Sequence, residues 1–192
     1  MPRLRHLLRL AALLPLACAL PSTTRADAPP VAHPAELRDG QHDFDFMVGT
    51  FRIKVRRLRN PLHGSSEWYE MTGTTSCRPF WNGKGNIEEA ELDGPDGHME
   101  AIMVRLYSPA SHQWSLNWAN AKNSRFDVPT IGEFKDGRGE FYDTEAFEGR
   151  QILVRYVWSD TNTSAPHFQQ SFSADGGKTW ELNWDAYSTR VR

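Results

Sequence analysis

FRIKVRRL, residues 51–58, alternates apolar and basic side chains along most of its length. Successive side chains of an extended strand point to opposite faces, so Phe51, Ile53 and Val55 would share one face and the intervening basic residues the other. This is the pattern of a half-buried strand, with one face against a core and the other in solvent. The segment therefore predicts a β-sheet that is covered on one side only.

Further strand-like runs follow through the rest of the chain. They are EWYEMTGTTSC, GNIEEAEL, EAIMVRLY, QWSLNWA, TIGEFK, GEFYDT, QILVRYVW, HFQQSFS and TWELNWDAYS. Turn phrases such as Asn82-Gly83 separate them, and no window of a dozen residues has a helical apolar stripe. We expect an all-β fold, a single antiparallel up-and-down β-barrel of about ten strands, because closure removes exposed sheet edges. A β-sandwich is the alternative.

The first 28 residues are typical of a secretory signal peptide. MPRLRHLLRLAALLPLACAL begins with arginines and continues into an apolar run that is shorter than the roughly 20 residues of a membrane span. Cleavage after Ala26 and after Ala28 both fit, and Cys18 leaves lipidation open. We expect a signal peptide at 1–28, a flexible Pro- and Ala-rich arm at 29–41 and a β-barrel domain at 42–192. The protein would be periplasmic or secreted.

Charge and cysteine content exclude several classes of protein. The net charge is −2 at pH 7, and no basic block follows the N-terminus, so we expect neither a nucleic-acid partner nor an anionic membrane surface. Loss of Cys18 with the signal peptide would leave Cys77 alone, without an internal disulfide. The remaining chain is long enough for one domain with its own core. It would be a monomer or a homodimer.

Four phrases carry a resemblance to a known family. They are HDFDFMVGTF at 42–51, RPFWNGKGNIEE at 78–89, YSPASHQWSLNW at 107–118 and SFSADGGKTWELNW at 171–184. The first resembles the opening strand of bacterial lipocalin-like domains, and the others resemble calycin-like bacterial barrels of unknown function, with a lipocalin- or nitrobindin-like fold. The resemblance spans about residues 42–190 and implies a barrel with an interior. It implies no particular activity, because this group includes lipid carriers, haem barrels and enzymes.

The motif W-x-L-N-W occurs twice, at residues 114–118 and 180–184. In a strand its tryptophans and leucine share one face, and its asparagine lies on the other. The tryptophans either fill the barrel core or line a pocket. Asn117 and Asn183 cannot point inward together with the tryptophans unless a bulge intervenes.

Polar residues within apolar runs are candidates for orienting a ligand. Glu88 lies on the opposite face from Ile87, and an inward carboxylate would have a perturbed pKa and could act as acid or base. Alternatively, these polar side chains face outward and are solvated. Asp127 either overhangs the mouth of the barrel or caps a turn. The candidate ligand-binding residues are Arg78, Trp81, Glu88, Asn117, Trp118, Asp127, Arg155, Asn183 and Trp184.

Other chemistry has little support in the sequence. The histidines show no metal-ligand spacing, so we expect neither a metal nor a cofactor, with haem on His112 or His167 as the alternative. No G-x-S-x-G phrase is present, so catalytic residues stay unknown. The phrase from Ser173 to Trp180 resembles an Asp-box hairpin, which predicts a structural turn.

The leading hypothesis is an exported barrel that binds a small, partly apolar ligand in its interior. Two alternatives stay open: an isomerase, cyclase or hydrolase that uses an inward carboxylate such as Glu88 or Glu181, and an envelope protein with a filled barrel. An enzyme should have a carboxylate–arginine or carboxylate–base pair in a water-accessible cavity. A carrier should have a mostly apolar cavity, and a structural protein none large enough for a ligand.

Overall fold

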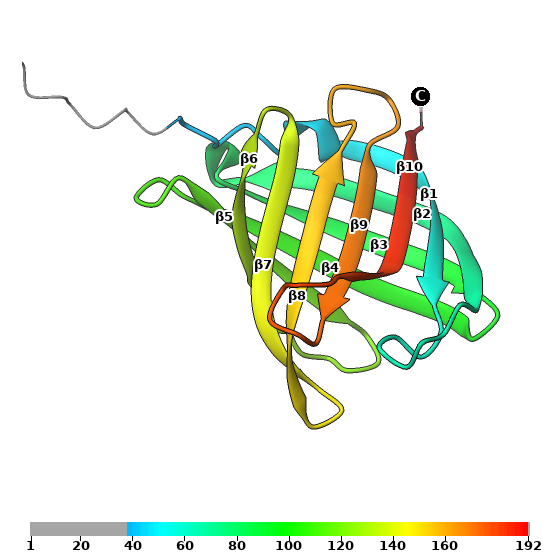
Figure 1. Ribbon diagram of the computed structural model, residues 1–192. Helices are drawn as coiled ribbons and strands as arrows, with labels where there is room; N and C mark the ends of the chain where they lie inside the picture. The colour runs from blue at the N-terminus through cyan, green and yellow to red at the C-terminus, as the bar shows by residue number, and fades with distance from the viewer. Residues whose placement is uncertain (1–37, 192) are drawn as a thin grey trace, which may run out of the picture. The chain divides into compact units, whose positions relative to one another are not determined.

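The computed structural model describes residues 38–191, which form a closed antiparallel barrel (Figure 1). Around the barrel the strands follow the order β1-β10-β9-β8-β7-β6-β5-β4-β3-β2, so each strand pairs with its neighbours in sequence and β1 pairs with β10. The strands are β1 (Gly49–Leu58), β2 (Trp68–Phe80), β3 (Gly85–Gly94), β4 (Gly97–Ser108), β5 (Gln113–Asn120), β6 (Thr130–Lys135), β7 (Arg138–Phe147), β8 (Arg150–Ser159), β9 (His167–Ser173) and β10 (Glu181–Arg190). The prediction of an up-and-down barrel is confirmed, and the sandwich is not formed.

Burial along β1 follows the alternation that its sequence predicts. Phe51 and Val55 are fully buried on the inner face, while Arg52 and Lys54 are exposed on the outer face. The same period runs through β4, where Ala101, Met103, Arg105 and Tyr107 are all buried. Side chains two residues apart therefore build the interior of the barrel, as its geometry requires.

The two ends of the barrel differ. The end near β1's start, which we call the closed end, is covered by residues 38–48, including the 3-10 helix η1 (Asp45–Met47). There Phe44 is 1% exposed, and its ring lies 5.1 Å from Trp114 and 5.0 Å from Phe134, in both cases edge to face. Such ring pairs contribute about 0.5–1.5 kcal/mol each beyond the burial of their surface. The Phe44 ring therefore fills the closed end of the barrel, and we call it the plug.

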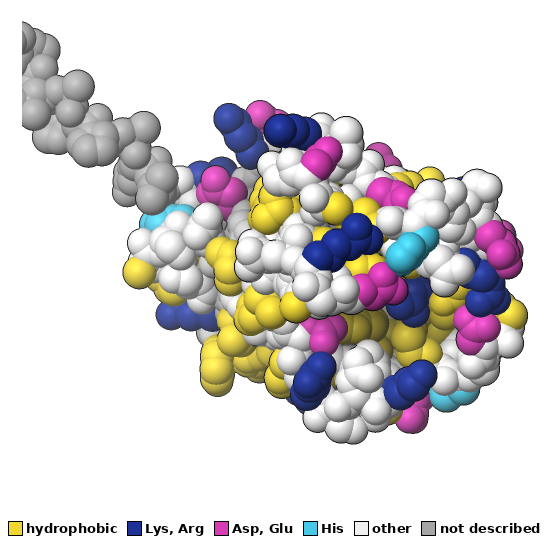
Figure 2. All heavy atoms as spheres, turned by 60° about the horizontal axis from the view of Figure 1, so that its bottom comes forward, with side chains coloured by type: hydrophobic (Ala, Val, Ile, Leu, Met, Phe, Trp, Pro, Cys, Tyr) yellow, Lys and Arg dark blue, Asp and Glu magenta, His cyan; other side chains and the backbone are white. Residues whose placement is uncertain are grey.

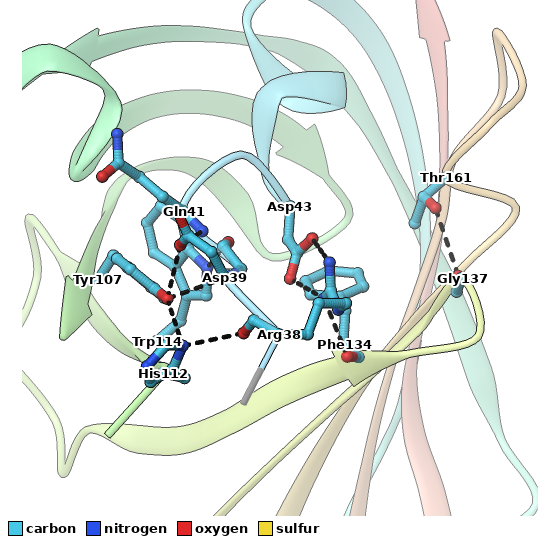
Figure 3. A network of polar contacts seen from close by, with 11 residues as sticks. Arg38, Asp39, Gln41, Asp43, Tyr107, His112, Trp114, Phe134, Gly137 and Thr161 are labelled. Atoms are coloured by element: carbon cyan, nitrogen blue, oxygen red, sulfur yellow. Dashed lines mark hydrogen bonds and ion pairs between the residues drawn. The ribbon is translucent and has the colours of Figure 1, made fainter. Parts of the chain in front are cut away.

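Hydrogen bonds hold residues 38–40 against the barrel beside Phe44 (Figure 3). The Trp114 indole donates to Gly40 O at 2.9 Å, and the Tyr107 hydroxyl donates to Asp39 Oδ1 at 2.9 Å while accepting from Gly40 N at 3.0 Å. His112 Nδ1 lies 2.9 Å from Arg38 O. The last four residues of the expected arm therefore pack on the barrel.

The predicted signal peptide at 1–28 and the rest of the predicted arm lie outside the described residues. Among residues 38–191, no helix has the length and apolar character needed to cross a membrane.

The opposite end, which we call the open end, carries the β1–β2, β3–β4, β5–β6, β7–β8 and β9–β10 connections. Figure 2 brings the lower part of Figure 1 forward and shows hydrophobic side chains with acidic and basic ones around them. The β9–β10 connection contains the Asp-box-like phrase. Thr179 N and Thr179 Oγ1 donate to the Asp175 carboxylate at 3.0 and 2.7 Å, and these bonds hold the pKa of Asp175 far below its usual value. Its role in the fold is a turn.

Candidate functional site

A cavity of about 380 Å³ lies inside the barrel, between the plug and the open end. Its wall consists of inward side chains from nearly every strand, together with the β5–β6 loop. Seven aromatic residues contribute to it: Trp118, Phe147, Tyr156, Trp158, Phe168, Phe172 and Trp184. The volume falls within the range of small-molecule pockets, about 300–1,000 Å³.

A second hollow, of about 440 Å³, lies beside Phe126 along β3, β4 and β5. Its lining includes Glu89, Glu91 and Glu100. This second hollow lacks the enclosing aromatic wall of the interior cavity. The interior is therefore the better candidate for binding a molecule.

The deep part of the cavity holds a buried ion pair. Arg105 is 1% exposed and donates through Nη2 to Glu88 Oε2 and through Nη1 to Asn86 Oδ1, the latter at 2.9 Å. The guanidinium also lies over the rings of Phe44 and Trp158, 4.9 and 5.5 Å from their centroids. Since Glu88 balances the charge of Arg105, the floor of the cavity is close to neutral.

The other Glu88 oxygen, Oε1, is not used by the bond to Arg105. Glu88 lines the cavity, so this oxygen is available to a bound molecule. Nearby Cys77 is buried, and burial raises the pKa of its thiol to about 11, which keeps it neutral and unreactive.

Three carboxyl groups gather toward the open end. Asp127 and Glu145 line the cavity, and Asp143 lies two residues before Glu145 on the same face of β7, opposite buried Val154. Burial raises the pKa of all three, and the negative charge of Asp127 adds to the shifts of Asp143 and Glu145. For Asp143 the pKa reaches about 8. Neither of its carboxyl oxygens has a partner in the described part of the chain.

Tyr156 stands beside these carboxyl groups. Its side chain lines the cavity and the residue is 8% exposed. Burial, and then the charges of Asp143, Glu145 and Asp127, raise the pKa of Tyr156 far above its usual value. The phenol is therefore a neutral group that can donate a hydrogen bond to a ligand.

Four of the predicted site residues line the cavity. They are Glu88, Trp118, Asp127 and Trp184. Of the two alternatives for Asp127, the structure favours an overhanging position, because its N–H bonds to Trp118 O at 2.9 Å and its side chain faces the cavity.

Three predicted residues lie outside the interior cavity. Arg78 is exposed, since its neighbour Cys77 takes the inner face of β2. Trp81 is 69% exposed in the 3-10 helix η2 (Trp81–Gly83) at the closed end. Arg155 lies on the outer face of β8, with its guanidinium 4.4 Å above the Trp180 ring.

The two W-x-L-N-W copies are not equivalent. Trp114 and Leu116 are core residues, each 1% exposed, and Asn117 faces outward, where its Nδ2 donates to Val104 O at 3.0 Å. Trp180, the counterpart of Trp114, packs outside beneath Arg155.

In the second copy a bulge intervenes. Leu182 pairs with Ser171 and Trp184 with Gln170, so Asn183 is the extra residue. The bulge lets Trp184 line the cavity while Asn183 is also buried, with its Oδ1 accepting from Gln170 Nε2 at 2.8 Å. Asn183 does not line the interior cavity. The phase conflict between asparagine and tryptophan is thus resolved by a bulge in β10 and by an outward side chain in β5.

Sequence reasoning missed Arg105, Asp143, Glu145 and Tyr156. Arg105 follows Met103 and Val104 in an apolar run, the same signal that drew attention to Arg155. Glu181, the alternative carboxylate, instead accepts a hydrogen bond from Leu62 N at 2.5 Å and does not line the cavity.

Neither haem candidate faces the interior. His112 bonds to Arg38 O at the closed end, and His167 lies 2.6 Å from Asp185 Oδ1 and stacks on Tyr187. Within residues 38–191 no three histidine, cysteine, aspartate or glutamate side chains are arranged to hold a metal ion. The described part of the chain thus offers no pre-formed metal site.

A comparison with models of known protein families found no match, and a search of curated proteins found no similar sequence.

Proposed function

We propose that this chain is an exported barrel that binds a small, partly apolar molecule in its interior. The observation that carries the proposal is the cavity of about 380 Å³, with its aromatic wall and its polar groups that lack protein partners. Export rests on the N-terminal sequence pattern alone.

The wall suits such a molecule energetically. Apolar surface that a ligand buries against the rings contributes roughly 25 cal/mol per Å². Glu88 and Tyr156 would orient the ligand, because both line the cavity and can exchange hydrogen bonds with a molecule bound there. The Phe44 plug leaves the open end as the route of entry.

The first test is native mass spectrometry of the mature protein purified from its own host, together with its absorbance spectrum. We expect an added mass that is retained by the wild type and lost in Met103→Trp, which fills the cavity. Ile102→Trp, on the opposite face of the same strand, is the control and should keep the mass. A bare protein that also fails to bind small aromatic probes would contradict the proposal.

A barrel enzyme is a second candidate, favoured by the Glu88–Arg105 pair in the cavity. Glu88 would accept a proton from the bound molecule through its free oxygen, while Arg105 holds the carboxylate in place. If the retained molecule is turned over, Glu88→Gln should abolish turnover while the molecule still binds. Binding without any conversion would leave the carrier as the better assignment.

A further inference from the structure

We propose that the molecule bound in this cavity is an organic cation: an amine or quaternary ammonium group on a small apolar or aromatic body. The proposal deepens the proposed function and depends on it. It rests on the aromatic wall, the placement of three carboxyl groups and the absence of basic partners for them among the described residues.

The aromatic wall offers ring faces to a cation. Trp118 and Trp184 meet with their ring centroids 6.2 Å apart, and Tyr156 and Phe168 with theirs 5.2 Å apart. All four residues line the cavity. A cation over such rings is attracted electrostatically, and more strongly when water is excluded.

The charges of the open end favour the same kind of ligand. Asp127 and Glu145 line the cavity without a salt bridge to any described residue, and Asp143 lies beside them. The positive charge of Arg125 acts on Asp127 but forms no salt bridge with it in the described part of the chain. The carboxyl groups therefore form the acidic side of the cavity.

The basic residues that line the cavity do not cancel this charge. Arg105 is already paired with Glu88 in the floor. Arg57 comes from β1, and its guanidinium lies over the Trp184 ring at 5.3 Å. Strand β1 is separated from β7, which carries Asp143 and Glu145, by β10, β9 and β8. One side of the opening is thus acidic and the other bears a single stacked arginine.

Trp158 supplies a second, independent sign of a missing partner. It is 5% exposed and lines the cavity, and its indole N–H has no hydrogen-bond partner in the described chain. Polar groups buried in this way are unfavourable unless a ligand or water satisfies them.

The geometry also favours an organic ion over a metal ion. The three carboxyl groups do not form a cluster that could hold a metal among residues 38–191. A cation with a wide apolar surface would instead contact the rings and the carboxylates together. Its charge would also favour the ionised form of Asp143, so binding near neutral pH would release protons.

The experiment compares three probes on the mature protein: benzyltrimethylammonium, its uncharged carbon isostere neopentylbenzene, and phenylacetate as the anion. Isothermal titration calorimetry at pH 7 gives the affinities, and buffers of different ionisation enthalpy give the proton count. We expect the cation to bind about tenfold more tightly than the isostere and the anion weakest. Proton release should accompany the cation only.

Variants locate the effect. Asp127→Asn and Glu145→Gln should each weaken the cation several-fold and leave the isostere unchanged, and Asp143→Asn should remove most of the proton release. Glu133→Gln, exposed on the outer face of β6, is the matched control and should change nothing. Asp127 lies in a loop, so its variant tests the proposal even if a change within β7 impairs folding.

Equal affinities for the cation and the isostere, or tighter binding of the anion, would overturn the cation proposal and leave the ligand-binding barrel standing. Failure of all three probes, together with a bare purified protein, would overturn both. Cation binding that the acidic variants do not change would also overturn the assignment of this site.

Discussion

Arg105 and Glu88 form an ion pair inside the barrel, on neighbouring strands and 17 residues apart in sequence. The side chains are 1% and 10% exposed, so water screens neither charge well. In such a site the loss of one partner is more harmful than the loss of both, because the remaining charge keeps its desolvation penalty.

Arg105→Met should therefore lower the free energy of unfolding by about 3–5 kcal/mol, measured by urea denaturation at pH 7. The double variant Arg105→Met/Glu88→Leu should recover much of this loss. Arg52→Met, on the exposed face of β1, is the control and should change stability by less than about 0.5 kcal/mol. A double variant less stable than Arg105→Met would contradict this interpretation of the pair.

The stability of the wild type should fall as pH rises from 5 to 8. The pKa of Asp143 is about 8 in the folded protein, well above that of an unfolded aspartate, so over this window the folded state keeps a proton that the unfolded state releases. Its contribution is complete below about pH 4 and is lost as pH passes through 8. After allowance for solvent screening, the decline is on the order of 2 kcal/mol.

Asp143→Asn should flatten this pH dependence and stabilise the protein at pH 8. Thermal denaturation between pH 5 and 8 measures the effect, with Asp136→Asn in the exposed β6–β7 turn as the control. Parallel pH profiles for the wild type and Asp143→Asn would show that Asp143 ionises normally. Glu145 and Asp127, with raised pKa values, would retain a smaller decline in the variant.

The plug at the closed end gives a test of packing. Phe44→Ala should lower the free energy of unfolding by about 3–5 kcal/mol, because the ring is 1% exposed and contacts Trp114, Phe134 and Phe141. Phe126→Ala removes a ring that is 52% exposed and should have a much smaller effect. Equal losses in urea denaturation would mean that the plug does not belong to the cooperative core.

The strand pattern could be predicted from the sequence, but the identity of the inner face was harder to predict. The period of two in residues 51–58 fixes which side chains share a face, and burial of Phe51 and Val55 follows from it. Arg78 and Arg155 also lie among apolar neighbours, yet both face outward. Only the register with neighbouring strands, which is a property of the whole barrel, distinguishes them from Arg105.

Other parts of the site leave even less trace in the sequence. In GEFYDTEAF, residues 139–147, both faces carry mixed polar and aromatic side chains, so nothing marks Asp143 and Glu145 as inward. No glycine in the sequence marks the position of the bulge at Asn183. It depends on how β10 fits β9, and such long-range pairing cannot be deduced from local alternation.

The β1–β2 loop, residues 59–67, should control exchange at the open end. Leu62 has φ of +66°, an unfavourable left-handed conformation for a bulky residue, and its N–H donates to Glu181 Oε1 at 2.5 Å. Arg150 donates to Leu62 O at 3.3 Å, and His63 Nε2 lies 2.6 Å from Glu148 Oε2. The loop is therefore tied to the starts of β8 and β10 and to the β7–β8 turn.

Glu181→Ala removes the charge-assisted bond that holds Leu62, a bond of about 1.5–3 kcal/mol. We expect backbone amides of residues 60–66 to exchange with deuterium about tenfold or more faster, while amides of β3 and β4 keep their rates. Neopentylbenzene should enter and leave the cavity faster in stopped-flow tryptophan fluorescence, with a similar equilibrium affinity. Glu133→Ala provides the control, since it removes a carboxylate from the outer face of β6. Unchanged exchange in the loop would mean that the Leu62–Glu181 contact does not restrain it, and the strained φ of Leu62 would then have to be held by Arg150 and His63.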